Sequence, residues 1–120
     1  MPENNTGYKA FTATAVAIAA YIRVKVDSAG LISVAGAAEN AIGVTTEAIA
    51  ASGTGTVKLF SAPGTYLMTT GAAIARGARL FPIAAGKVDD AGTTSLNLVA
   101  LEAATADGDV IECAPAFLGA

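Results

Sequence analysis

A chain of 120 residues can bury one hydrophobic core, so its length favours a single domain. Hydrophobic residues make up 53% of it and charged residues only 14%, and the formal net charge at pH 7 is −3. The seven basic residues are scattered and form no basic stripe, which argues against nucleic acid as a partner. The excess of small apolar residues favours an oligomer or attachment to a large partner, unless alanine merely fills the surface.

The N-terminal residues lack the features of a secretory signal. Met1–Gly7 is polar and acidic, without the basic start and apolar centre of a signal peptide. We expect residues 1–14 to form an N-terminal arm that is flexible or bound by a partner, and residues 15–120 to form the folded domain.

The segment from Phe11 to Val26 has the most helix-like and most membrane-like composition. It is too short and too rich in threonine to span a bilayer, and Arg23 and Lys25 interrupt it. With a period of two, alternate residues fall on one face, which predicts a long strand with one buried face: Val16, Ile18, Ala20, Ile22, Val24 and Val26. Some of these residues also fit helical spacing, and alanine favours helix, so a helix is the alternative.

Short strands are predicted along the rest of the chain. Asp27–Gly30 has the polar and glycine residues of a tight turn, so Leu31–Val34 is predicted to return as the second strand of a hairpin. Further strands are predicted at 41–45, 57–60, 65–69, 79–81, 96–102 and 109–113. Segment 48–56 has no periodicity and is predicted to be a loop, mobile or ordered by a partner. The pattern predicts an all-β fold, a small single-domain β-barrel or β-sandwich.

Two stretches of the chain repeat one pattern. Val44–Ala48 and Val99–Ala103 both end in Glu-Ala, and each is followed by a small-residue loop, a glycine and a strand that contains valine. The repetition predicts two similar halves that close the barrel together. Chance similarity in a low-complexity sequence is the alternative.

The residues that could carry chemistry are few. The chain has no histidine, so a catalytic base would have to be a carboxylate or a lysine, and we expect no enzymatic activity. Asp89-Asp90 and Asp107-Gly108-Asp109 lack the alternating ligands and distal glutamate of a calcium loop. They are predicted to be turns, and no metal or cofactor is expected. The single cysteine, Cys113, is predicted to be a buried or half-buried strand thiol rather than a nucleophile.

Two polar segments remain as candidate contact sites. One is Ser52, Gly53, Thr54, Gly55 and Thr56, which lacks the lysine and following helix of a phosphate-binding loop and is predicted to be flexible. The other is Arg76 and Arg79, which flank a glycine and could reach an acidic partner. Two solvated charges on a turn are the alternative for the arginines.

Five motifs occur along the chain in a recognisable order. They are Ala20–Val26, Ala41–Val44, Gly77–Pro82, Ala85–Val88 and Ala100–Glu112, all within residues 15–115. This order resembles the small capsid decoration, or cement, proteins of tailed bacteriophages. The resemblance implies a structural protein with no active site, which binds the major capsid protein and stabilises an expanded icosahedral head. It also implies a homo-oligomer, a dimer or a trimer, on the outer surface of the virion. The scattered basic residues and the lack of a bilayer-spanning segment predict no nucleic-acid or membrane partner.

Contact residues can be proposed within this resemblance. The candidates for capsid contact are Tyr8, Lys9 and Phe11 on the arm, together with the Ser52–Thr56 loop, and Arg76 and Arg79 are candidates for contacts within the oligomer. A tail or baseplate component and a self-assembling surface-layer module are alternatives. A small ligand-binding barrel is a further one, although an aromatic fraction of 6% without tryptophan argues against a sugar site.

Overall fold

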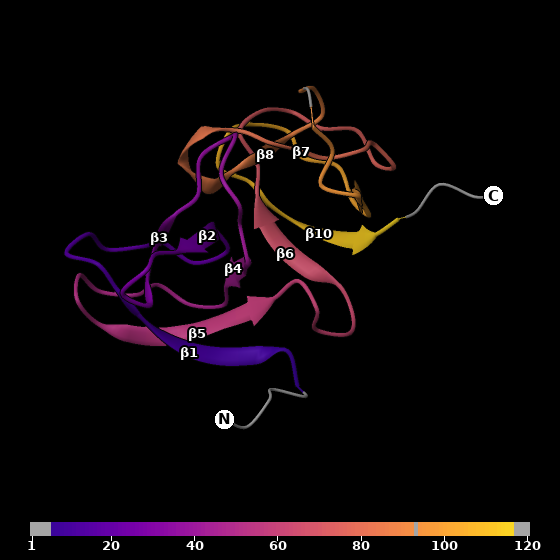
Figure 1. Ribbon diagram of the computed structural model, residues 1–120. Coiled ribbons are helices and arrows are strands. Elements are labelled where there is room, and N and C mark those ends of the chain that lie inside the picture. The colour runs from indigo at the N-terminus through magenta and orange to yellow at the C-terminus, as the bar shows by residue number, and fades with distance from the viewer. Residues whose placement is uncertain (1–5, 93, 117–120) are drawn as a thin grey trace. The chain divides into compact units, whose positions relative to one another are not determined.

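The computed structural model describes residues 6–92 and 94–116, which are all-β and contain no α-helix. The elements are β1 Tyr8–Ala13, β2 Arg23–Val26, β3 Leu31–Val34, β4 Gly43–Thr45, β5 Thr54–Leu59, β6 Tyr66–Thr69, β7 Phe81–Pro82, the short 3-10 helix η1 Ala84–Gly86, β8 Val88–Asp89, β9 Leu98–Ala100 and β10 Val110–Pro115 (Figure 1). The chain forms two compact units. Unit 1 runs to Ala35 and resumes over Glu39–Pro63; unit 2 comprises Gly36–Ala38 and the chain from Gly64 onward. Within the described ranges, no helix has the length and apolar character needed to cross a membrane.

Unit 1 is a closed five-stranded barrel, which confirms the predicted all-β barrel. Its strand order is β1-β3-β2-β4-β5, and β5 returns to pair with β1. The β1–β3 pair is parallel, and the other four pairs are antiparallel. Closure gives every strand of this sheet a hydrogen-bonded neighbour on both sides, although the β1–β3 ladder is short and covers only Thr12 and Ala13 of β1.

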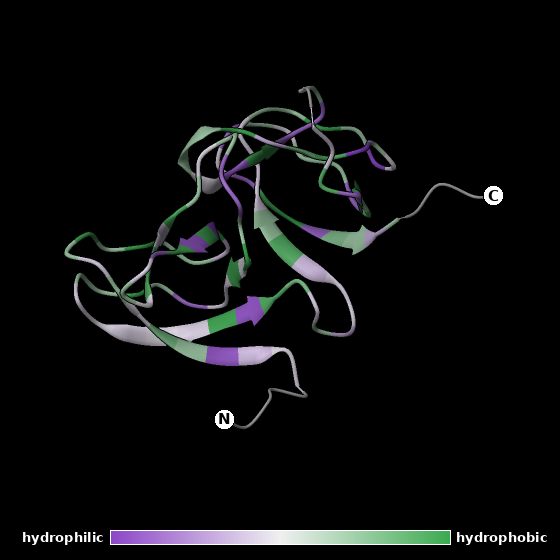
Figure 2. Ribbon diagram, in the orientation of Figure 1, coloured by the Kyte–Doolittle hydropathy of each residue, from purple (hydrophilic) through white to green (hydrophobic). Residues whose placement is uncertain are grey.

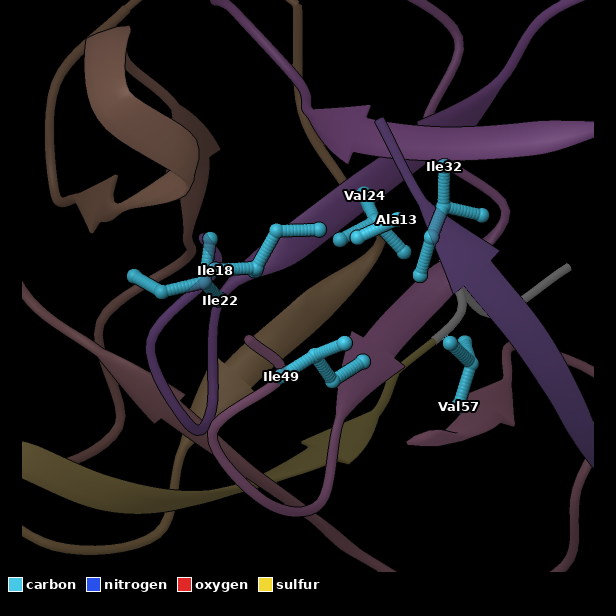
Figure 3. Packing of buried hydrophobic residues seen from close by; sticks show 7 residues of the cluster. All are labelled: Ala13, Ile18, Ile22, Val24, Ile32, Ile49 and Val57. Atoms are coloured by element: carbon cyan, nitrogen blue, oxygen red, sulfur yellow. The ribbon is translucent and has the colours of Figure 1, made fainter. Parts of the chain in front are cut away.

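The barrel encloses an aliphatic core drawn from both strands and connections. Figure 3 shows side chains that converge from β1, β2, β3 and β5 and from the segments between strands: Ala13, Ile18, Ile22, Val24, Ile32, Ile49 and Val57. Burying one valine or isoleucine side chain stabilises a fold by about 1.5–3 kcal/mol. Phe11 and Leu59 pack against this core from partly buried positions. Hydrophobic burial is therefore what holds the five strands together.

The long strand predicted from Phe11 to Val26 is wrong, and so is the alternative helix. β1 ends at Ala13 and β2 begins at Arg23. The chain between them leaves the sheet. In this connection Ile18 forms an isolated bridge with Ile49, in which the two residues exchange backbone hydrogen bonds of 2.8 Å. Ile18, Ile22 and Val24 are buried as the alternation predicted, but Val16 is 66% exposed and Val26 is 41% exposed.

Thr45 fixes the bend that precedes β2. Its Oγ1 accepts a hydrogen bond from Ile22 N at 3.1 Å and donates one to Ala19 O at 2.7 Å. Its backbone accepts from Tyr21 N at 2.9 Å and donates to Ile22 O at 3.0 Å. Tyr21 takes a left-handed conformation, φ 60°, which is costly for a residue with a side chain. These four hydrogen bonds from one buried residue hold that conformation.

The predicted N-terminal arm is also corrected in part. Residues 8–13 form β1, which pairs with β3 on one side and β5 on the other. The prediction failed for two reasons. The outward residues of β1 are small or polar and give no clear strand pattern, and the strands that pair with β1 lie far along the chain. Residues 1–5 lie outside the described part. The same pairing draws Thr54–Thr56 into β5, so the predicted loop 48–56 is shorter than expected.

The remaining strand predictions are confirmed in place, with shorter or shifted ends. The hairpin of β2 and β3 turns at Asp27–Gly30, where Asp27 Oδ1 accepts hydrogen bonds of 2.9 Å from Ala29 N and Leu31 N. Gly30 has φ 82°, the left-handed conformation that glycine adopts easily. The predicted strand 79–81 is seen as Phe81–Pro82, and 96–102 is seen as Leu98–Ala100.

Unit 2 repeats the strand order of unit 1. Its ladders are β6-β10-β9 and β7-β8, and two single bridges, Thr70↔Val88 and Arg79↔Val99, connect them. The resulting ring is β6-β8-β7-β9-β10, which matches β1-β3-β2-β4-β5 strand for strand. The two halves are therefore similar, as the repeat predicted. They do not close one barrel together, because the five strands of the closed barrel all belong to unit 1.

Individual hydrogen bonds support this equivalence, with an almost constant offset along the chain between matching residues. The Ile18–Ile49 bridge corresponds to Ile74–Ala104 in unit 2. Ser52 N donates to Thr14 O at 2.7 Å, and Gly108 N donates to Thr70 O at 2.8 Å. Two further pairs of hydrogen bonds follow the same offset: Tyr21 N to Thr45 O with Gly77 N to Ala100 O, and Thr45 N to Ile22 O with Ala100 N to Ala78 O. A shared pattern at one offset indicates an internal duplication.

Candidate functional site

The residues predicted for capsid contact come together where β1 pairs with β5. The register places Phe11 opposite Gly55 and Thr12 opposite Thr54. The two candidate groups, which are far apart in sequence, are thus adjacent strands of one sheet. The candidate residues do not all lie on one face of this sheet, because successive residues of a strand point to opposite faces.

The outer face of this strand pair is the candidate site, and we call it the β1–β5 surface. It consists of three cross-strand pairs: Tyr8 with Lys58, Ala10 with Thr56, and Thr12 with Thr54. Lys9 and Phe11 belong to the other side of β1, where Phe11 packs against the barrel core and Lys9 Nζ lies 6.0 Å from the Phe11 ring centroid. Of the predicted residues, Tyr8, Thr54 and Thr56 therefore share this surface.

Lys58 is the residue of this surface that the sequence analysis missed. Its Nζ lies 5.7 Å from the centroid of the exposed Tyr8 ring, within the range of a cation–π contact. Such a contact contributes about 0.5–1 kcal/mol at an exposed site. β1 and β5 each carry a strongly hydrophilic segment (Figure 2), and the sequence of each strand contains one lysine. Alternation along the strand from Val57 would have pointed Lys58 outward.

Hydroxyl groups line the other end of the β1–β5 surface. Thr12 Oγ1 and Thr54 Oγ1 lie 3.0 Å apart and share a hydrogen bond. Ser52, in the turn that precedes β5, has φ 58° and donates from its backbone N to Thr14 O at 2.7 Å. This turn is thus hydrogen-bonded to the barrel.

Gly55 is required at its position by packing inside the barrel. A Cβ atom there would lie 2.5 Å from Ile49 Cγ1, well inside van der Waals contact. The glycine lets the Ile49 side chain fill the space beneath the strand, and β5 then stays straight enough to pair with β1 along its length.

The chemistry of the β1–β5 surface is that of a contact surface. Its residues include Lys58 and no carboxylate, together with threonine hydroxyls, one exposed aromatic ring and Ala10. Lysine and threonine donors can bind carboxylates and carbonyl oxygens of a partner, while Ala10 permits close approach. Across the part of the chain that the structure describes, no group of three or more His, Cys, Asp or Glu residues is arranged to hold a metal ion.

Arg76 and Arg79 are both exposed and lie in unit 2 on the segment before β7. Gly77 between them has φ 85°, which makes the predicted turn. Arg79 forms an antiparallel bridge with Val99. The arginines therefore belong to unit 2, whereas Tyr8 and Lys58 belong to unit 1.

The acidic and thiol groups singled out in the sequence have structural roles. Asp109 accepts hydrogen bonds from Thr105 N at 2.8 Å, Thr105 Oγ1 at 2.9 Å and Ala106 N at 3.2 Å, which lower the pKa of its carboxyl. It closes the turn predicted at 107–109, where Asp107 pairs with Lys87 Nζ at 2.8 Å.

Cys113 is fully buried, as predicted. Burial raises the pKa of its thiol to about 12, and the nearby carboxylates of Glu102 and Glu112 add to the rise. Because the thiolate is the nucleophilic form, a thiol with so high a pKa is inert at neutral pH.

Comparison with known proteins gives a fold relationship. No family model matches the chain, and no curated protein matches it. Among solved structures, it is similar to the crystal structure of the N base of head fiber gp8.5 of bacteriophage phi29. The TM-score is 0.71 at 17% sequence identity, and the match covers 88% of this chain and 92% of that one. The chain therefore shares the fold of the N base over residues from both units.

Proposed function

We propose that the protein is a structural component of a bacteriophage virion that binds the outside of the head and stabilises it, as a decoration or cement protein. The observation that carries this proposal is the fold shared with the N base of a phage head fiber over most of both chains. The motif order resembling decoration proteins supports it independently. In this role the protein acts through surfaces and has no enzymatic activity.

The partner in this proposal is the major capsid protein, and the contact is the β1–β5 surface. Two rigid strands present the Tyr8 ring, the Lys58 ammonium and the Thr12 and Thr54 hydroxyls in fixed register. A preordered surface loses little conformational entropy when it binds. Repetition over a symmetric shell turns a modest contact per subunit into a large stabilisation, since one capsomer cannot leave without breaking several contacts.

Binding to shells tests this proposal, with a control taken from the same strand pair. Purified protein is mixed with expanded heads that lack it, and the bound fraction is measured by co-sedimentation. Lys58→Glu reverses a charge on the β1–β5 surface, and Lys9→Glu makes the same change on the opposite side of β1. We expect saturable binding of the wild type and of Lys9→Glu, and binding at least about tenfold weaker for Lys58→Glu.

Other results would contradict parts of the proposal. Equal binding of the two variants would remove the β1–β5 surface as the contact. Absence of binding by the wild type, together with tubes or sheets formed by the protein alone, would favour a tail component or a surface-layer module instead.

A further inference from the structure

The first half of β1 is paired on one side only, because its two neighbours cover different lengths of it. On one side, β5 pairs with β1 from Tyr8 to Thr12 (Figure 1). On the other side, the ladder with β3 covers only Thr12 and Ala13. Within the described ranges, the part of β1 before Thr12 therefore has an open side, and Ala10 in the middle of this part is exposed. We call this open side, from Tyr8 to Ala10, the β1 edge.

The hydrogen bonds between β1 and β5 show which backbone groups point to the β1 edge. Near the two ends of the ladder, Gly7 O accepts from Leu59 N at 2.7 Å, and Ala13 N donates to Gly53 O at 2.8 Å. In an antiparallel ladder, residues with and without such bonds alternate. The odd-numbered residues of β1 thus bond to β5, and the even-numbered ones do not. The backbone N–H and C=O of Ala10 therefore point away from β5, to the open side.

The backbone groups of Tyr8 that point to the β1 edge are bonded locally. Thr6 Oγ1 accepts from Tyr8 N at 3.3 Å and donates to Tyr8 O at 3.4 Å. Both distances are longer than those of well-formed hydrogen bonds. An incoming strand can replace these bonds with shorter ones, and it can bond directly to the exposed backbone of Ala10.

Lys58 decides which chemistry an incoming strand should carry. Its Nζ lies 5.7 Å from the centroid of the Tyr8 ring, so the side chain leans from β5 over β1. A strand added to β1 places every second side chain on the same face as Tyr8. A carboxylate at that place can pair with the ammonium group. A second copy of β1 would bring another lysine there, and lysine on an edge deters pairing between copies.

We infer that the β1 edge binds an extended segment of the major capsid protein as an added strand, with a carboxylate side chain of that segment beside Lys58. The inference rests on the proposed function and specifies how the contact is made. Main-chain hydrogen bonds to Ala10 supply part of the affinity, and the side chains of the β1–β5 surface select the segment.

Two substitutions of Ala10 test the inference. Ala10→Pro removes the N–H that points to the β1 edge, and it removes no hydrogen bond to β5, so the barrel should tolerate it as edge strands tolerate proline. Ala10→Val is the matched control, because it adds a side chain of similar size and keeps the N–H. In co-sedimentation with expanded heads that lack the protein, we expect Ala10→Pro to bind at least about tenfold more weakly than Ala10→Val. Circular dichroism and urea unfolding establish that both variants fold.

Hydrogen exchange of the wild type provides a test that needs no variant. In the free protein, the Ala10 amide should exchange fast and the Phe11 amide, which is bonded to β5, slowly. After binding to heads, exchange at Ala10 should slow at least about tenfold. An Ala10 amide that exchanges equally fast in the free and the bound protein would overturn strand addition.

The salt dependence of head binding tests the carboxylate. Lys58→Gln should lose most of the salt dependence of the wild type, whereas Lys58→Arg, which keeps the charge, should retain it. Equal salt dependence of these two variants would overturn the acidic character of the segment.

These results separate the inference from the proposed function. A wild type that does not bind heads would overturn both. A wild type that binds, while folded Ala10→Pro binds as tightly as Ala10→Val, would overturn the inference alone.

Discussion

Replacing Thr45 tests the central structural device of unit 1, the bend between β1 and β2. In Thr45→Val the side chain keeps its shape but loses the hydroxyl, so the buried Ile22 N–H and the Ala19 carbonyl both lose their partner. Leaving a buried polar group unpaired costs about 1–3 kcal/mol. Two such groups give an expected loss of about 2–6 kcal/mol, a large part of the roughly 5–15 kcal/mol typical of a folded domain.

Thr45→Ser is the matched comparison, because it keeps the hydroxyl and removes one methyl group. Its expected cost is about 1 kcal/mol, from the lost burial of that methyl. Urea unfolding followed by circular dichroism measures both changes, and hydrogen exchange at Val24 and Ile32 assigns them to unit 1. If Thr45→Val proved no less stable than Thr45→Ser, the hydroxyl would not be what holds the bend.

Three further outcomes follow from the structure. Cys113 should resist thiol reagents at neutral pH until the protein unfolds, and rapid labelling of the native protein would contradict its burial. The free energy of unfolding should fall between pH 9 and about 12, where the unfolded thiol ionises and the folded one does not, and Cys113→Ala should lessen that fall. Gly43→Ala should lower the free energy of unfolding in urea by about 3 kcal/mol or more, because the new Cβ would lie 2.2 Å from a backbone oxygen of β5. Gly30→Ala has open space around it but φ 82°, so it should cost about 1–2 kcal/mol, and similar costs for the two variants would refute the packing argument. The stability that Asp109 provides through its hydrogen bonds should be present above its ordinary pKa of 3.8 and be lost as the pH falls below it. The free energy of unfolding of Asp109→Ala, measured across this acid range, should therefore fall less than that of the wild type.

Local sequence signals predicted the features that depend on neighbouring residues. The Asp27–Gly30 turn formed where its polar and glycine residues placed it, and the two strands of its hairpin followed. The Glu-Ala repeat at 47 and 102 likewise marked two equivalent segments, which the hydrogen bonds of the two units confirm. Burial of Cys113 could be predicted from its apolar strand.

Features that depend on distant partners could not be predicted in this way. The apolar alternation continues from Phe11 to Val26, but the left-handed Tyr21 interrupts the strand because Thr45, well beyond the β2–β3 hairpin in sequence, holds it there. β1 was interpreted as an arm because its pairing with Thr54–Leu59 is equally remote.

The candidate site illustrates the same limit. Polarity alone selected Tyr8 and the Ser52–Thr56 segment, but only the register of β1 with β5 shows that Lys58 stacks on the Tyr8 ring and that Lys9 points the other way. The open side of β1 is likewise visible only in the ladders that flank this strand.

The most direct test of the proposed head-stabilising role is the temperature at which expanded heads lacking the protein come apart, measured with and without a saturating amount of it. A cement protein binds to saturation and raises the disruption temperature, and Lys58→Glu raises it less than Lys9→Glu does. An unchanged disruption temperature at saturation would contradict the stabilising role.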